Sequence, residues 1–432
     1  MNRSVSENVF LNRNYRLTFF GVLVSDLGAL LYSFAVGFYI LEISGNNAFL
    51  QGAYLAMCGA VALVFTPIGG VMGDRWNKAR IMFVCDYLKG ALILLSAMLM
   101  SVFPGSDAHI VILFAAGLCA NAVSGVFAPA SGALLPHIVD EQRLQQATAY
   151  FSVLRSLQTI FGAVLAGVLY AALPIRALLL VVGICYLLSG ISEMFIRYEH
   201  RQSKGRLTLK LALADMRDGF LYLRAQKPIM ALMGAILFIN FFFSPIPGNF
   251  IPYFVKTDVA NAPGYLFDGL LTPELWSSAF SMLLGAGSLV GSAILSGREP
   301  REKCGRQTAR RLCVVAAIVI ALTVGYRTLV VRAVSLDGFL LLFSLGVLIT
   351  GFLLPCINIP VSTALMRAVD RDKLSKVNSI IGILSQGLIP IASVLSGVVL
   401  RCGGSAALLL ICSAGFTVTA LSLLFNKRVG DI

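Results

Sequence analysis

Charged residues are scarce in this chain of 432 residues: 13% carry a charge, whereas 58% are hydrophobic and the mean hydropathy is +0.84. A water-soluble protein has roughly a quarter charged residues, so water is not the main solvent of this chain. Only three histidines are present, far apart in sequence, and none of the nine cysteines stands in a C-x-x-C pair. The sequence therefore predicts no metal site, no disulfide framework and no cofactor.

Catalytic motifs are missing as well. The sequence contains no H-E-x-x-H, no G-x-S-x-G and no G-K-[ST] phosphate loop, so we expect no catalytic residues and no enzyme activity. A receptor or sensor would be expected to carry a soluble signalling domain, and no such domain is visible. Neither class is therefore favoured by the sequence.

Long hydrophobic runs fill the chain instead, and about 20 apolar residues are enough to cross a bilayer as a helix. Lipid requires every backbone hydrogen bond to be made internally, and the alternating pattern of a β-barrel is absent. We therefore predict an all-α membrane protein with twelve transmembrane helices. The predicted spans are residues 17–41, 51–72, 81–103, 109–131, 150–173, 176–195, 228–254, 275–297, 312–332, 338–362, 376–400 and 405–425.

The basic residues are distributed unevenly between the two sides of the membrane. With a cytoplasmic N-terminus, all but five of the 34 lysines and arginines fall on the inner side or at inner span ends. This is the positive-inside bias, and it predicts that both termini are cytoplasmic. The net charge of +13 then indicates contact with anionic membrane lipid rather than a nucleic-acid partner. The five exceptions are Arg176, Lys256, Arg327, Arg332 and Arg401.

A polar interruption at 197–227 divides the chain into six spans before it and six after it. Its leucines, Met216 and Phe220 recur at helical spacing, which favours an amphipathic helix on the membrane surface; a soluble linker helix is the alternative. The motif that begins at Pro129 recurs at Pro360 in the same orientation. These observations predict two parallel six-helix halves. The expected divisions are 1–196 for the N-terminal bundle, 197–227 for the linker and 228–432 for the C-terminal bundle.

The loop between the second and third spans carries the most specific motif. It resembles the G-x-x-x-D-R-x-G-R-K motif of the major facilitator superfamily, although Asn77 stands where that family has glycine. The resemblance implies a gating loop that latches the two halves, with Asp86 as an acidic partner in the next span; a basic loop that only orients the protein is the alternative. The predicted gating residues are Gly70, Gly73, Asp74, Arg75, Lys78, Arg80 and Asp86.

Across most of its length the chain also resembles the macrolide-efflux branch of this superfamily. The residues that carry this resemblance are Asn12–Leu17, the gating loop, Gly132–Val139 and the central loop. The resemblance implies a bacterial plasma-membrane protein that exports small amphipathic molecules, with a proton or another ion as the coupling partner, and we expect a monomer. Another cargo, such as a lysophospholipid, a siderophore or a metabolite, remains the alternative. The fourth span lacks the arginine of proton-coupled drug antiporters, which makes proton antiport less secure than export.

Asp26 lies well inside the first span without a neighbouring cation in sequence. Ionisable residues within a span are costly and mark functional sites. We therefore predict that Asp26 binds a proton or a cationic substrate; a structural hydrogen bond to another span is the alternative. Glu42, Glu193 and Arg155 lie near span ends, where snorkelling to the membrane surface explains them.

Further cavity residues are predicted among the polar and aromatic side chains of the spans expected to face the pore. The prolines and phenylalanines of the seventh span indicate a bendable aromatic wall suited to bulky or cationic molecules. Each polar residue could instead bridge helices, and half of the phenylalanines could face lipid. The candidates are Tyr32, Tyr54, Asn121, Gln158, Asn240, Phe241, Phe243, Asn358 and Gln386.

Overall fold

The structure is a computed structural model of the whole chain. It describes residues 9–140, 143, 147, 150–151, 153–155, 157–197, 227–262, 271–296, 305–332, 334–368 and 386–425. Within these ranges the regular secondary structure is helical and no strand is present. Most of the predicted linker, residues 197–227, and the second copy of the repeated motif from residue 369 onward lie outside the described residues, so the predicted domain boundaries stay predictions.

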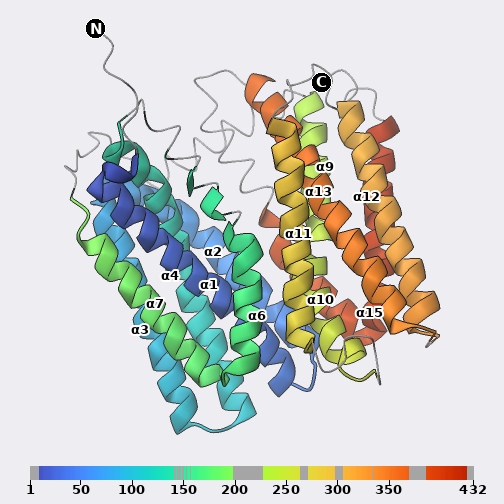
Figure 1. The fold of residues 1–432 in the computed structure, drawn as a ribbon, viewed down its shortest axis with the longest axis horizontal. Helices are drawn as coiled ribbons and strands as arrows, with labels where there is room; N and C mark the ends of the chain where they lie inside the picture. The colour runs from blue at the N-terminus through green and yellow to red at the C-terminus, as the bar shows by residue number, and fades with distance from the viewer. Residues whose placement is uncertain are drawn as a thin grey trace. The chain divides into compact units, whose positions relative to one another are not determined.

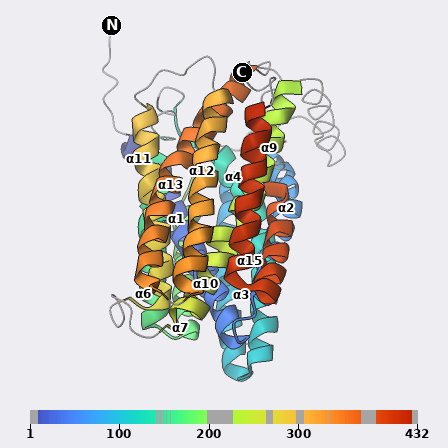
Figure 2. The same ribbon diagram turned by 90° about the vertical axis from the view of Figure 1, so that its right-hand side faces the viewer.

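By its contacts the chain divides into two compact units, which we describe separately. Unit 1 comprises Met1–Tyr39 and Met57–Lys210, and unit 2 comprises Ile40–Ala56 and Leu211–Ile432. Figures 1 and 2 show the helices of both units. The helices of the first half of the chain are α1 (Arg13–Ile43), α2 (Ala48–Arg75), α3 (Lys78–Val102), α4 (Ser106–Ile138), the π-helix η2 (Gln158–Gly162), α6 (Ala163–Ala172) and α7 (Ile175–Met194), preceded by the short 3₁₀ helix η1 (Val9–Leu11).

In the second half, prolines interrupt the first span, as the sequence predicts. Pro245, Pro247 and Pro252 lack the backbone N–H that a regular α-helix needs, and the helix is broken there by π-helical turns. The helices of this half are α9 (Lys227–Phe243), η3 (Ile246–Phe250), α10 (Ile251–Phe254), η4 (Val255–Val259), α11 (Pro273–Ser296), α12 (Gly305–Gly325), η5 (Tyr326–Val330), α13 (Leu336–Ala368) and α15 (Ile389–Phe425).

Eleven of the described helices are long and apolar enough to cross a membrane. One of them, α15, has 37 residues, far more than the roughly 20 that a single span needs. Gly404 interrupts it with φ 67° and ψ −171°, a backbone conformation that favours glycine. Gly404 lies between the last two predicted spans, 376–400 and 405–425, so α15 contains described residues of both spans.

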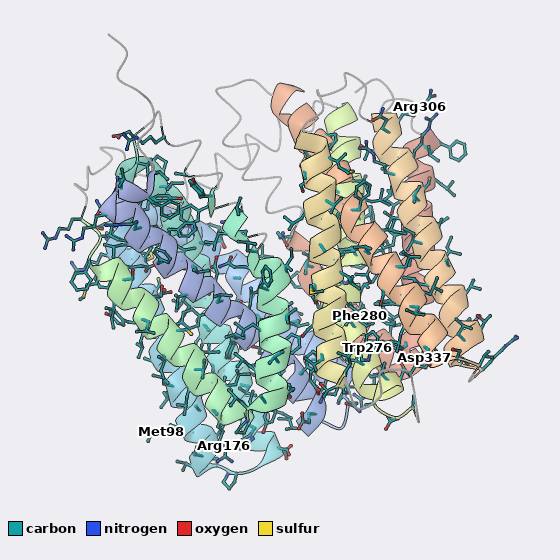
Figure 3. The ribbon with its side chains drawn as sticks, viewed as in Figure 1. Met98, Arg176, Trp276, Phe280, Arg306 and Asp337 are labelled. Carbon is teal, nitrogen blue, oxygen red and sulfur yellow. The ribbon has the colours of Figure 1, made fainter. Side chains whose placement is uncertain are left out.

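In unit 1, α3 and α7 pack closely side by side (Figure 1). Gly90 and Gly183 face each other at this crossing: a Cβ at Gly90 would lie 3.1 Å from the carbonyl oxygen of Gly183. Small residues allow such close approach of membrane helices. Figure 3 shows Met98 of α3 and Arg176 of α7 at the same end of unit 1, as expected for two antiparallel neighbours.

The start of α1 is tied to three other segments of unit 1. The side chain of Asn12 donates to the carbonyl oxygen of Ile138 at 2.7 Å, while its own oxygen caps the first turn of α1. Asn14 exchanges two hydrogen bonds with the backbone of Arg197. The hydroxyl of Tyr15 donates to the carbonyl oxygen of Ala147. These residues, part of the Asn12–Leu17 motif, thus fix α1 to the ends of α4 and α7.

At the opposite end of unit 1, His109 joins α1, α3 and α4. Its ring nitrogens lie 2.8 Å from the hydroxyl of Tyr39 and 3.1 Å from the carbonyl oxygen of Met100. The His109 side chain is buried. It therefore caps the last turn of α3 from inside the protein.

In unit 2, α12, α15 and α9 lie side by side (Figure 2). Figure 3 shows Arg306 and Asp337 at opposite ends of this unit, at the starts of the antiparallel helices α12 and α13. Trp276 and Phe280 of α11 join Phe250, Phe254, Phe339 and Phe343 in a buried cluster of aromatic rings.

The tip of the α1–α2 hairpin, residues Ile40–Ala56, packs within unit 2. Gly45 and Asn46 make the turn at positive φ, where these residue types are tolerated. On the α2 side, a Cβ at Gly52 would lie 2.4 Å from the carbonyl oxygen of Ser393, and a Cβ at Gly397 would lie 2.6 Å from the carbonyl oxygen of Ala48. The hairpin tip and α15 are therefore in backbone contact.

Replacing Gly397 with Ala is expected to destabilise the protein by about 1–3 kcal/mol, because the added methyl group meets a backbone oxygen that cannot move aside. Gly387→Ala is the matched control, since nothing lies within 4 Å of its Cβ position; this change should be neutral or stabilise by up to about 1 kcal/mol. Thermal unfolding in detergent measures both. Equal effects of the two changes would contradict the close contact.

Candidate functional site

Asp26 of α1 is half-buried, and its carboxylate lines a cavity of about 410 Å³ within unit 1. Arg155 lines the same cavity and is one of the cations nearest to Asp26. The sequence predicts snorkelling for Arg155, but the structure places it along this cavity. The other lining residues are Thr18, Val22, Phe127, Ala128, Ser131, Gly132, Leu135, Pro136 and Phe151.

The lining makes this cavity, which we call the Asp26 cavity, suitable for an amphipathic ligand. It offers one carboxylate, one guanidinium, two hydroxyls and two phenyl rings on an otherwise aliphatic wall. Its volume lies within the range of small-molecule pockets, roughly 300–1,000 Å³. A molecule with an amine and an apolar body could therefore bind with its amine at Asp26 and its rings against Phe127 and Phe151.

Gln158 holds Asp26 from the fifth span. The residue begins the π-helix η2, and such turns displace a side chain from its regular helical direction. The Gln158 amide donates to the carbonyl oxygen of Leu23 at 3.3 Å and also hydrogen-bonds the Asp26 carboxylate. The predicted role of Gln158 as a cavity residue stays a prediction, but the structure brings it next to Asp26.

An ion pair is buried beside this site, between α1 and α3. The ammonium group of Lys89 lies 2.7 Å from Asp86, and both side chains are shielded from solvent, with exposed fractions of 4% and 0%. Ser25 accepts from Lys89 at 3.3 Å and donates to Asp86 at 3.1 Å. The rings of Phe127 and Tyr186 lie 4.3 and 4.4 Å from the same ammonium group, so Lys89 is surrounded by partners.

Glu193 of α7 is completely buried next to this pair. The sequence predicts snorkelling for it, and that prediction is wrong. The span end at Met194 does not expose the side chain, because α1 passes directly over it: a Cβ at Gly21 would lie 2.9 Å from Glu193 Cγ. The only indication of this burial in the sequence is the i, i+4 spacing of Ser189 and Glu193, which places both on one face of the helix.

The predicted gating loop lies at the junction of α2 and α3. Gly73 is buried against Ala130 of α4, and Lys78 is also buried, while Arg80 is exposed. Asn77, which replaces the family's glycine, has φ −60° and caps α3 by accepting from the backbone of Arg80. Asparagine therefore fits this position without strain.

The remaining gating residues divide into two groups. Gly70 is half-buried with open space at its Cβ position, whereas the side chains of Asp74 and Arg75 lie outside the described residues. Asp86 contacts Lys89 and Ser25 in the interior. Its predicted part in a gate stays a prediction.

The other cavity candidates are not gathered in one place by the described contacts. Tyr32 and Tyr54 are buried, Asn121 donates to the carbonyl oxygen of Gly117 in its own helix, and Asn358 and Gln386 are exposed. In unit 2, Asn240, Phe241 and Phe243 are half-buried; Phe241 contacts Phe242 edge-on, and Phe243 borders a cavity of only about 40 Å³. Their roles stay predictions.

The predicted aromatic wall is wrong for part of the seventh span. Phe250 has no exposed surface and stacks on Phe254 in the core of unit 2.

Near the same helix, Lys256 pairs with Glu274 at 2.8 Å and with Glu42 of the hairpin tip at 3.3 Å. Glu42 is thus held by an ion pair. Among the described residues no group of three His, Cys, Asp or Glu side chains could hold a metal ion.

Comparison with known proteins places this geometry in a family context. The sequence model described as Major Facilitator Superfamily matches residues 18–394. The chain is 26% identical over 298 residues to the uncharacterized MFS-type transporter YkuC of Bacillus subtilis, which aligns over 66% of this chain and 65% of YkuC, just under two thirds of the relative's length. It is 25% identical to macrolide efflux protein A of Streptococcus pyogenes, over 60% of this chain and 66% of the relative.

Solved structures share the fold. The structure of a bacterial homologue of the iron transporter ferroportin in an inward-facing state superposes with a TM-score of 0.70 at 15% identity, covering 96% of this chain and all of that one. The nucleoside transporter NupG superposes with a TM-score of 0.72 at 13% identity, with the same coverage. At these identities the likeness concerns the fold alone.

Proposed function

Because the chain belongs to the major facilitator superfamily, whose sequence model matches residues 18–394, we propose that it is a secondary active transporter that exports small amphipathic molecules from a bacterial cell. Members of this family are generally transporters, not enzymes. The protein is a multi-pass membrane protein with bacterial relatives. The proposal adds the direction of transport, the class of substrate and coupling to an ion gradient across the plasma membrane, with both termini in the cytoplasm.

The Asp26 cavity is the observation that carries this proposal. It combines a carboxylate and a guanidinium with aromatic and aliphatic walls, which suits a molecule with a polar or cationic head and an apolar body. A charged side chain at this depth of a span is costly and is retained where it binds a substrate or an ion. The names of two relatives, macrolide efflux protein A and the putative bacilysin exporter BacE of Bacillus subtilis, agree with export as the direction.

Asp26 would couple export of the substrate to entry of a proton by binding the two in turn. When the carboxylate is ionised it attracts a cationic substrate, and when it binds a proton that attraction is lost. A proton that enters from outside would thus displace the substrate on the outer side. The Arg155 guanidinium in the same cavity limits the number of positive charges that can bind together, which favours one cation at a time.

Accumulation of a solute panel in cells with and without the intact gene tests this function. The panel contains amphipathic cations, a lysophospholipid and a siderophore, each measured with and without a protonophore. We expect the gene to lower accumulation of amphipathic cations severalfold and the protonophore to remove that difference. A gene effect on the lysophospholipid or siderophore alone would refute the proposed substrate class.

A further inference from the structure

Glu193 lacks the partners that a buried carboxylate normally has. Its side chain has no exposed surface, and neither carboxylate oxygen has a hydrogen-bond partner. Two serines of α7 close the site: Ser189 donates to the carbonyl oxygen of Gly21 at 2.8 Å, and Ser192 donates to that of Leu17 at 3.0 Å. These bonds hold α1 flat against α7 directly over Glu193.

The charges around Glu193 do not neutralise a further anion. Its charged neighbours are Asp86 and Lys89 of α3 and Asp26 of α1. Lys89 is already paired with Asp86 and bonded to Ser25. Asp86 itself keeps one oxygen without a partner. Three carboxylates thus face a single ammonium group.

Among the described residues, Lys89 is the one cation that neighbours Glu193. Cys85 of α3 contributes a buried thiol, Tyr186 of α7 a buried phenol, and α4 the ring of Phe127. Arg155 faces Asp26 from the cavity. An ionised Glu193 in this place would lack the hydrogen bonds and the unshared cation that a buried charge needs.

We propose that Glu193, together with Asp86 and Lys89, forms a second proton-binding site that is buried between α1, α3 and α7 and is separate from the Asp26 cavity. In the conformation described here the proton sits on a carboxylate oxygen of Glu193. Movement of α1 away from α7 admits water, the O–H bond of the carboxyl group breaks, and the proton passes to that water. This inference rests on the proposed function, in which a proton is the coupling ion.

Helix α1 links the two sites. Ser25, which bonds the Asp86–Lys89 pair, is adjacent in sequence to Asp26, which lines the cavity. Any rotation or tilt of α1 that changes the cavity also changes the contacts of Asp86 and the cover of Glu193. Protonation of Glu193 therefore depends on the position of α1 and in turn favours the position in which α1 covers Glu193.

Infrared spectroscopy of the full-length protein in lipid vesicles tests this site without a substrate. We expect wild type to show the C=O stretching band of a protonated carboxyl group at neutral pH, and we expect the band to lose intensity as the pH is raised while the protein stays folded. In an Asp26→Asn background, where Asp26 contributes no carboxyl band, Glu193→Gln should remove the band. Glu274→Gln, the matched control, removes a carboxylate that is paired with Lys256 and should leave the band unchanged.

Each outcome decides the inference. In the Asp26→Asn background, a band that is absent before the Glu193→Gln change, or that persists after it, refutes a proton on Glu193. If the intensity of the band does not change with pH while the protein stays folded, the proton is permanent and structural. That result also refutes a proton-binding site that exchanges its proton. The spectrum needs no transported solute. If the gene changes the accumulation of no solute in the panel but the Glu193 band still depends on pH, only the proposed function is refuted.

Discussion

Asp26→Asn is expected to abolish the pH dependence of transport while the protein remains folded. Asparagine keeps the size of the side chain and can still accept from Gln158, but it cannot bind or release a proton. Coupling between two ligands is typically worth about 1–3 kcal/mol, or 5–150-fold in affinity. In wild type we therefore expect an efflux rate with a pH gradient at least about fivefold above the rate without one. In the variant we expect the two rates to be equal.

Two variants separate this account from a purely structural role of Asp26. Asp107→Asn changes an exposed acid of α4 in the same unit and should leave the gradient effect intact. Gln158→Leu removes the hydrogen bond to Asp26 but keeps the carboxylate, so it should alter the pH at which transport is half-maximal without abolishing coupling. If Asp26→Asn transports with unchanged pH dependence, then Asp26 only bonds a neighbouring span. Efflux from vesicles with an imposed pH gradient measures all three.

Lys89→Met is expected to cause the largest loss of stability. It removes the cation that faces Asp86 and leaves a buried carboxylate without its partner, which typically costs about 3–5 kcal/mol. The side chain also loses its contacts with the rings of Phe127 and Tyr186. Thermal or denaturant unfolding in detergent should show this loss directly.

The double variant Lys89→Met/Asp86→Leu distinguishes charge from packing. Replacing a buried pair by apolar residues is often neutral, so the second change should restore most of the lost stability. Arg176→Gln, which removes an exposed cation of α7, should change stability by less than about 0.5 kcal/mol. A double variant no more stable than Lys89→Met would show that the ion pair is not the cause.

The sequence predicts the fold well because membrane helices are specified locally. Runs of apolar residues, the prolines of the seventh span and the distribution of basic residues each act within a short segment. The break of α15 at Gly404 illustrates this: the gap between two apolar runs already separates the last two spans. The halves and the central linker remain predictions, since most of 197–227 lies outside the described residues.

The candidate site is predicted only in part. Asp26 stands out because a lone acid within a span is rare, and Gln158 follows from its polarity in a facing span. Glu193 and Arg155 are missed, because their positions near span ends also fit snorkelling. What buries Glu193 is the close passage of α1 over it at Gly21, and no local pattern around Glu193 indicates that contact.

The phenylalanines of the seventh span show the opposite error. Their number favours a ligand-binding wall, but Phe250 and Phe254 form part of the aromatic core of unit 2. Composition alone does not tell a core from a cavity, since both are apolar and aromatic. The direction of each ring depends on the π-helical turns around Pro247, which the sequence indicates only as irregular.

Counterflow in proteoliposomes tests the central claim, transport of amphipathic molecules by this chain, most directly. Vesicles that contain the purified protein are loaded with an unlabelled amphipathic cation and diluted into the labelled one. We predict transient accumulation of label above that of protein-free vesicles, competed by other amphipathic cations. Uptake equal to that of protein-free vesicles across the panel, with the protein shown to be folded, would contradict the account.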